Sequence, residues 1–159
     1  MKSIWVWAAV LFVSVVGVGG ASAQDKKLKD QIIGTWEFVS GDVLWGTSPK
    51  GLMTFTENGW FTWQVFRSDR PKFKSNDRRR PTPEENLTTT AGSLAYFGTY
   101  TVNETSRTIV TRVVASTFPN SEGEQQRRLI TKITPDELAY TNPSNTSGNS
   151  VAAVWKRLK

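Results

Sequence analysis

The strongest constraint on the fold is a series of short β-rich segments that starts near residue 34 and continues to the end of the chain. Turn-forming residues separate these segments about every ten positions, and no long helical periodicity interrupts them before the eighties. Eight antiparallel strands can close into a barrel that leaves no strand edge exposed. We therefore predict an all-β fold, an eight-stranded antiparallel up-and-down barrel, with strands near residues 34–45, 50–57, 60–68, 95–102, 107–115, 124–133, 137–142 and 150–158.

The first 23 residues have the pattern of a bacterial export signal. Lys2 supplies an early positive charge, an apolar stretch follows, and Ala21-Ser22-Ala23 matches the small-residue cleavage signature. The apolar stretch is shorter than the ~20 residues that a membrane-spanning helix needs. We expect cleavage before Gln24, no stable membrane anchor afterwards, and a soluble periplasmic or secreted domain formed by residues 24–159.

The chain contains neither histidine nor cysteine. This composition excludes disulfides, thiolate metal sites, histidine-ligated zinc or haem, and Ser-His-Asp chemistry. We expect no metal and no other cofactor. Without the signal the formal net charge falls from +6 to +5, which is only mildly basic. The arginine run at 78–80 lacks the interleaved aromatic residues that nucleic-acid binding uses, so we expect no nucleic-acid partner.

Asn58-Gly59 is the signature of a two-residue turn between the second and third strands. Such a turn would pair Thr54 with Trp63 and would determine which side chains share a face. Those side chains either line a ligand cavity or simply fill the barrel, and both readings are compatible with the pattern. The candidate ligand contacts from this hairpin are Leu52, Thr54, Phe61, Trp63 and Val65, with Arg67 continuing the same face.

Alternation predicts the inward faces of the next strands. Tyr96 and Tyr100 share one face of the fourth strand, and Thr111 lies on the apolar face of the fifth. On the sixth strand, Leu129 and Ile133 favour an inward face made of the odd-numbered residues. The further candidate ligand contacts are therefore Tyr96, Tyr100, Thr111, Arg127 and Leu129.

Arg127 and Arg67 could hold an acidic ligand head group at the barrel mouth, with Tyr100 as a hydroxyl donor. The alternative is that each arginine lies on a solvated rim. A register shift of one residue would reverse the assignment of either strand.

A long excursion between the third and fourth strands predicts one short helix. Thr82 suits the N-cap, Pro83 the first turn and Glu85 the third position of a capping box. We expect this helix to end near Gly92 and to lie across the barrel as a flap or rim, because its apolar content is small. Asp69 with a neighbouring arginine is expected to clasp the excursion.

Gly34-Thr35-Trp36 at the start of the first strand and Trp155-Lys156-Arg157 at the end of the last resemble the lipocalins of the calycin superfamily. The resemblance implies that Trp36 plugs one end of the barrel while Arg157 packs over it. More of the sequence is similar to the bacterial lipocalin-like domain proteins with a helix inserted between strands three and four. The stretches that carry this similarity are residues 34–40, 67–71, 83–85, 94–100, 126–128 and 154–155. Members of that branch often carry a histidine on the fifth strand, where this chain reads Val110-Thr111-Arg112-Val113.

The leading hypothesis is a lipocalin-like protein that binds a small hydrophobic or amphipathic ligand in its barrel. A second hypothesis is an isomerase or cyclase in the same cavity, in which Tyr100, Arg127 or Asp69 assists proton movement. A third is a filled barrel whose exposed Trp60 and Phe66 contact another protein. The sequence indicates no oligomeric state.

Overall fold

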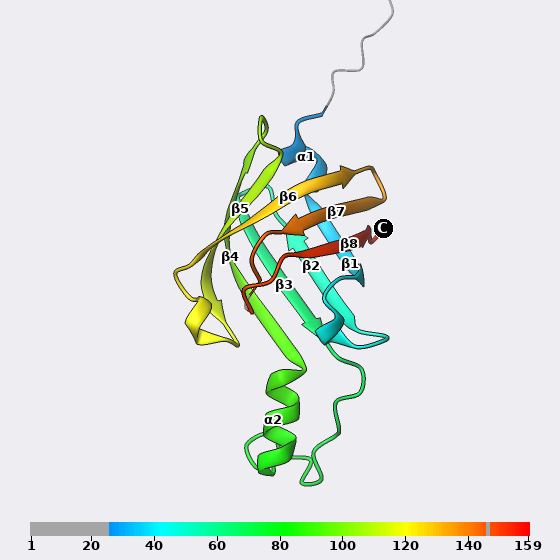
Figure 1. Cartoon of the computed structure of the whole chain (residues 1–159), viewed down its shortest axis with the longest axis vertical. Coiled ribbons are helices and arrows are strands. Elements are labelled where there is room, and N and C mark those ends of the chain that lie inside the picture. Colours follow the sequence, from blue (N-terminus) through cyan, green and yellow to red (C-terminus); the bar gives the residue numbers. More distant parts are fainter. Residues whose placement is uncertain (1–25, 146) are drawn as a thin grey trace, which may run out of the picture.

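The computed structural model describes residues 26–145 and 147–159, which form one closed antiparallel barrel (Figure 1). The strands follow one another around the barrel in sequence order, and the first pairs with the last. The predicted fold is therefore confirmed. The predicted export signal and its cleavage site lie outside the described residues. The strands are β1 (Gly34–Ser40), β2 (Lys50–Phe55), β3 (Trp60–Phe66), β4 (Ser93–Asn103), β5 (Thr108–Ser116), β6 (Gln125–Ile133), β7 (Glu137–Asn142) and β8 (Val151–Arg157).

Short helices occupy the two ends of the barrel. The α-helices are α1 (Leu28–Ile32) and α2 (Pro83–Ala91), and the 3₁₀-helices are η1 (Val43–Trp45) and η2 (Pro119–Ser121). In the described ranges, none of the helices combines the length and the apolarity that crossing a membrane requires.

Trp36 closes one end of the barrel, and its side chain is fully buried. Its indole Nε1 donates to the Ile32 carbonyl at 2.8 Å, and the Arg157 guanidinium lies 4.0 Å from the indole ring centroid. Arg157 also donates to the Ile33 carbonyl at 2.6 Å. A Cβ on Gly34 would lie 2.6 Å from the Arg157 guanidinium, and Gly34 has a φ of +125°. Glycine at this position therefore lets the guanidinium reach the indole, as a plugged barrel end requires.

The first helix covers the same end. Leu28 and Ile32 of α1 are buried against the core, and the Glu104 carboxylate accepts the backbone N–H groups of Leu28 and Lys29 at 2.8 and 3.1 Å. Because Glu104 lies in the turn after β4, this contact ties the N-terminal helix to the far side of the barrel end. Trp36 therefore plugs this end of the barrel and α1 covers it.

The predicted two-residue turn between β2 and β3 is wrong. The Thr56 N–H donates to the Trp60 carbonyl at 2.9 Å, the Gly59 N–H donates to the Thr56 carbonyl at 3.2 Å, and Gly59 has a φ of +84°. This geometry is a three-residue loop in which a left-handed glycine follows a tight turn. The additional loop residue shifts the pairing by one position, so that Met53 lies opposite Trp63.

The shifted register reverses the face of β2 but not that of β3. Met53 is fully buried inside the barrel, whereas Leu52 is 37% exposed and Thr54 lies on the same outer face. Leu52 and Thr54 were expected to point inward, and that expectation is wrong. Trp63, by contrast, is buried inside as expected, together with Phe61 and Val65.

The inward face of β6 is also opposite to the prediction. Arg128 and Ile130 are buried, whereas Arg127 is exposed and Leu129 is 41% exposed. A bulge between Ile130 and Lys132 then breaks the alternation and turns Ile133 back toward the core. Ile133, which favoured an odd-numbered inward face, lies after the bulge. Before the bulge, the even-numbered residues point inward.

The faces of β4 and β5 agree with the prediction. Tyr96 and Tyr100 of β4 are buried, and so are Thr111 and Val113 of β5. Arg112 between them is exposed. Tyr96 and Thr111 on these two strands both contact Arg128 of β6 inside the barrel.

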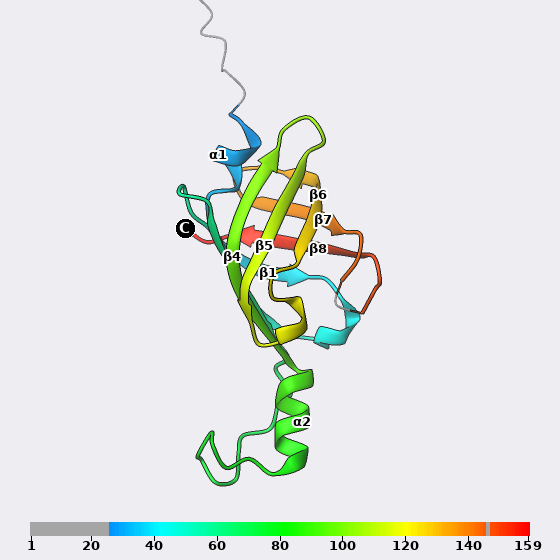
Figure 2. The same cartoon turned by 90° about the vertical axis from the view of Figure 1, so that its left-hand side faces the viewer.

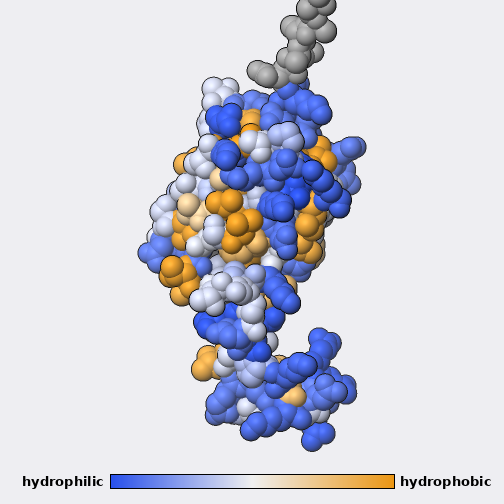
Figure 3. Space-filling view, turned by 90° about the vertical axis from the view of Figure 1, so that its right-hand side faces the viewer, coloured by the Kyte–Doolittle hydropathy of each residue, from blue (hydrophilic) through white to orange (hydrophobic). Residues whose placement is uncertain are grey.

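The segment between β3 and β4 forms the predicted capped helix, but this helix is positioned differently relative to the barrel. The Thr82 hydroxyl accepts the Glu85 N–H at 3.2 Å, and the Glu85 carboxylate accepts the Thr82 N–H at 2.9 Å, which is a complete capping box. Figures 1 and 2 show α2 extending away from the barrel at the end opposite α1, so it does not lie across the barrel as a flap. Its last turn contributes to the rim, where Thr90 and Ala91 line the cavity. Hydrophilic side chains cover most of this projection (Figure 3). Only its C-terminal end reaches the barrel.

Replacing Trp36 with alanine should destabilise the protein by about 3–5 kcal/mol, because a large, fully buried side chain is lost together with its stacking on Arg157. The matched control is Trp60→Ala, since Trp60 is 43% exposed and should cost about 1 kcal/mol or less. Urea unfolding followed by circular dichroism measures both variants. Similar losses at the two positions would show that Trp36 does not hold the barrel end.

Candidate functional site

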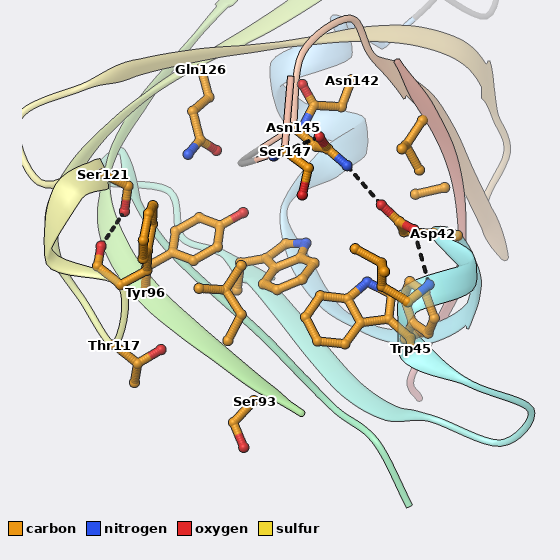
Figure 4. Close-up of a pocket in the computed structure, with 18 of the residues that line it drawn as sticks. Asp42, Trp45, Ser93, Tyr96, Thr117, Ser121, Gln126, Asn142, Asn145 and Ser147 are labelled. Atoms are coloured by element: carbon orange, nitrogen blue, oxygen red, sulfur yellow. Dashed lines mark hydrogen bonds between the residues drawn. The ribbon is translucent and has the colours of Figure 1, made fainter. Parts of the chain in front are cut away.

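A cavity of about 290 Å³ lies inside the barrel at the end opposite Trp36. It is small for a ligand-binding pocket, since such pockets span roughly 300–1,000 Å³. Its mouth lies among the β1–β2, β5–β6 and β7–β8 loops (Figure 4). Thr90 and Ala91 at the C-terminal end of α2 also line it. The lining residues include Phe38, Asp42, Leu44, Trp45, Trp63, Ala91, Leu94, Tyr96, Phe118, Gln126, Arg128, Tyr140, Asn142, Asn145 and Ala153.

Aromatic rings form a continuous wall on one side of the cavity. The Trp63 ring stacks on Tyr96 at a centroid distance of 5.0 Å and meets Trp45 at 5.8 Å. Trp45 reaches this position because η1 turns the chain back toward the barrel after β1. Trp63 is almost fully buried and Trp45 is half-buried, so the wall runs from the interior to the mouth.

A buried guanidinium lies on the inner wall. Arg128 is only 2% exposed and donates to the Thr111 hydroxyl at 2.9 Å, the Tyr96 hydroxyl at 2.7 Å and the Gln126 side-chain oxygen at 2.8 Å. It also lies 5.7 Å from the Tyr140 ring centroid. Thus β4, β5, β6 and β7 each contribute one side chain that holds or contacts the guanidinium.

Burial and charge set the ionisation of this cluster. Burial raises the pKa of the Tyr96 hydroxyl to about 12, although the neighbouring Arg128 charge acts in the opposite direction. Burial also disfavours the charged form of Arg128, but Tyr96 and Tyr140 favour it, and its pKa stays above the ordinary value. At neutral pH the Tyr96 hydroxyl is therefore neutral beside the positive charge of Arg128.

The mouth carries a separate polar pair. Asp42 accepts the Asn145 side-chain amide at 2.7 Å and the Leu44 N–H at 3.0 Å. Because Asp42 follows β1 and Asn145 follows β7, this pair fastens two rim loops together. Figure 4 shows Asp42 and Trp45 across the cavity from Tyr96 and Gln126.

Of the predicted ligand contacts, the structure brings two into the cavity lining: Trp63 and Tyr96. Phe61 and Val65 lie in the packed core, and Thr111 touches the site by accepting from Arg128. Leu52, Thr54, Arg127 and Leu129 face outward, and Tyr100 donates to the Thr56 carbonyl at 2.7 Å, toward the plugged end.

Arg67 also lies away from the cavity. It pairs with Asp69, its Nε donating at 2.9 Å, and this interaction lowers the pKa of the Asp69 carboxyl. Arg70 donates to the Arg67 carbonyl at 2.8 Å and to Ser93 at 2.8 Å, and it lies over the Phe66 ring. These contacts tie the start of the excursion to its end, and the proton-transfer roles considered for Tyr100, Arg127 and Asp69 have no cavity position.

The principal residue that sequence reasoning missed is Arg128. Its neighbour Arg127 was predicted to point inward because Leu129 and Ile133 are also odd-numbered. The bulge between Ile130 and Lys132, which changes the alternation before Ile133, has no signature in the sequence. Trp45 and Asp42 were missed because they belong to a loop. The one usable signal was Ile130, which favours the even-numbered face of β6.

Comparisons with known proteins bear on the family. A family model described as a lipocalin-like domain matches residues 33–158. Curated proteins give no match. Among solved structures, a lipocalin-like protein from Bacteroides uniformis is 14% identical, with a TM-score of 0.45, and the match covers 80% of this chain and 99% of that one. The family match includes both strands that close the barrel, β1 and β8.

The raised pKa of Tyr96 predicts a specific loss of stability at high pH. The folded protein keeps Tyr96 protonated up to a pKa of about 12, whereas an unfolded tyrosine ionises near 10. This contribution is complete below pH 10 and lost as the pH rises toward 12, by about 2–3 kcal/mol in total. Urea unfolding at pH 9 and pH 12 should show a smaller decrease for Tyr96→Phe than for the unchanged protein. Equal decreases would mean that the pKa of Tyr96 is not raised in the folded protein.

Proposed function

Because the chain belongs to the lipocalin-like domain family, we propose that it is an exported protein that binds one small, mainly apolar ligand in its barrel. The observation that carries this proposal is the cavity of about 290 Å³ whose wall is formed by the Trp45, Trp63 and Tyr96 rings. A barrel plugged at one end and hollow at the other gives a ligand one entrance and a water-poor interior.

The aromatic wall supplies the affinity. Burying apolar ligand surface contributes roughly 25 cal/mol per Å², and the rings present that surface without needing to be ordered on binding, because they already stack on one another. The small volume favours a compact or narrow ligand.

Export is the second part of the proposal. The N-terminal charge, the apolar stretch and the Ala21-Ser22-Ala23 site together support removal of the first 23 residues and a periplasmic or secreted location. The domain needs no disulfides in that compartment, because the plug and the closed barrel hold it together.

Removing one ring of the aromatic wall should weaken the binding of a neutral apolar probe. We expect N-phenyl-1-naphthylamine to bind the unchanged protein with saturable fluorescence enhancement, and Trp45→Ala and Trp63→Ala to weaken binding at least about tenfold through lost stacking and burial. Trp60→Ala is the matched control, since Trp60 lies on the same strand as Trp63 but faces outward.

Two results would contradict this part of the proposal. One is that the unchanged protein does not bind the probe at any concentration. The other is a loss at Trp60 equal to the losses at Trp45 and Trp63, which would place the probe on the outer surface.

Expression of the full 159-residue chain in a bacterial host should yield a processed protein in the periplasm or the medium. Its intact mass should correspond to a chain that starts at Gln24, because cleavage follows Ala23. An Ala23→Lys variant, which spoils the small-residue site, should accumulate unprocessed. Full-length mass for the unchanged chain, retained in the cytoplasm, would refute the export proposal.

A further inference from the structure

Arg128 carries a buried positive charge that no carboxylate neutralises among the described residues. Its side chain is 2% exposed, and the ion pairs in the described ranges involve other residues, at the surface. Tyr96 does not supply a negative charge, because its pKa is about 12. Asp42 lines the same cavity but accepts hydrogen bonds from Asn145 and Leu44 at the rim.

The cluster around Arg128 also contains more hydrogen-bond donors than acceptors. A guanidinium has five N–H groups, and Arg128 uses three in bonds to Thr111, Tyr96 and Gln126. The Tyr96 hydroxyl oxygen accepts from Arg128, and the Tyr140 hydroxyl oxygen accepts the Trp63 indole N–H at 3.3 Å.

Because both tyrosines already accept a hydrogen bond, each retains its own O–H for donation. Among the residues that the structure describes, neither hydroxyl donates to a partner, and the Gln126 side-chain amide likewise donates to none. Guanidinium, hydroxyl and amide donors thus converge on one side of the cavity, and what they lack is an acceptor with negative charge.

This arrangement is costly unless something compensates it. A buried charge without a counter-charge is destabilising, and hydroxyl groups that accept a hydrogen bond without donating one leave part of their hydrogen-bonding capacity unused. A well-packed apolar side chain at position 128 would avoid both costs. Retaining an arginine there, held in place from four strands, makes physical sense if it meets an anion inside the barrel.

We propose that the Arg128 cluster recognises the carboxylate of an amphipathic monocarboxylic acid, which enters the barrel head-first. This inference rests on the proposed function, because it assigns a ligand class to the same cavity. The single positive charge of Arg128 matches a single negative charge, and its planar fork matches a carboxylate. Tyr96 and Tyr140 supply hydroxyl donors beside it.

The position of Arg128 sets the orientation of that ligand. It is the fourth of nine residues in β6, so its head lies well inside the barrel, while Trp45, Leu44 and Phe118 line the cavity toward the mouth. Leu44 is 56% exposed and Phe118 is 40% exposed. An apolar tail would therefore leave the carboxylate, pass the Trp63–Trp45 wall and end among these apolar rim side chains.

The test compares probes that share an eight-carbon tail and differ in the head group: octanoate, octan-1-ol and octyl phosphate. Tryptophan fluorescence reports binding, because Trp45 and Trp63 line the cavity. In the unchanged protein at pH 7.5, octanoate should bind about 10- to 100-fold more tightly than octan-1-ol, as expected for charge-assisted hydrogen bonds, and more tightly than octyl phosphate.

Two neighbouring arginines give a matched pair of variants. Arg128→Met should reduce the octanoate preference to about onefold while N-phenyl-1-naphthylamine still binds, and Arg127→Met should keep the preference unchanged, since Arg127 is exposed. Tyr96→Phe should reduce the preference by about 3- to 10-fold. If Arg128→Met fails to fold, the head-group preference of the unchanged protein and the Tyr96→Phe variant still decide the question.

The outcomes separate the two levels of the account. If the naphthylamine binds but octanoate is no better than octan-1-ol, or octyl phosphate binds best, the carboxylate inference is wrong and apolar binding stands. If Arg127→Met removes the preference while Arg128→Met keeps it, the inference is equally wrong. If none of the probes binds, the proposed function itself fails.

Discussion

The stacking of Arg157 on Trp36 is the interaction on which the rest of the structure depends. A sheet of eight strands that closes on itself has two ends, and an apolar interior open at both would admit water throughout. The Arg157 guanidinium lies 4.0 Å from the Trp36 ring centroid and bonds to a carbonyl at the end of α1, so one contact joins the first strand, the last strand and the N-terminal helix. With that end closed, the cavity inside the barrel lies at the other end.

The hollow end combines an aromatic wall with a polar cluster, and the two meet at Tyr96, whose ring stacks on Trp63 and whose hydroxyl bonds to Arg128. Trp45 and Trp63 offer apolar area, whereas Arg128, Tyr96 and Gln126 offer donors. Either wall alone would fit many guests, but together they describe a molecule with an apolar body and an acidic end. The essential feature of the site is therefore one positive charge placed beside a row of aromatic rings.

The fold and the site were not equally readable from the sequence. Strand positions and the capped helix follow from alternation and capping residues, which act locally. The Trp36 plug was predicted from the resemblance to the lipocalins. The inward face of β2 does not, because Asn58-Gly59 fits both a two-residue and a three-residue loop and the choice depends on backbone pairing.

The same limit applied to β6, with a larger effect on function. Arg127 and Arg128 are adjacent and chemically identical, and a bulge near Ile130 decides which of them enters the barrel. Bulges depend on how two strands twist against each other, which a single sequence does not express. The positions of Trp45 and Asp42 could not be predicted for a related reason. Both belong to a loop, and the conformation of that loop depends on the strands that it connects.

A crystal structure of the protein grown with octanoate tests the central claim most directly. The account predicts the carboxylate within hydrogen-bonding distance of the Arg128 guanidinium and the Tyr96 hydroxyl, with the chain passing Trp45 toward the mouth. A carboxylate in solvent at the mouth with the alkyl chain buried beside Arg128, or a barrel interior that excludes the molecule, would contradict it.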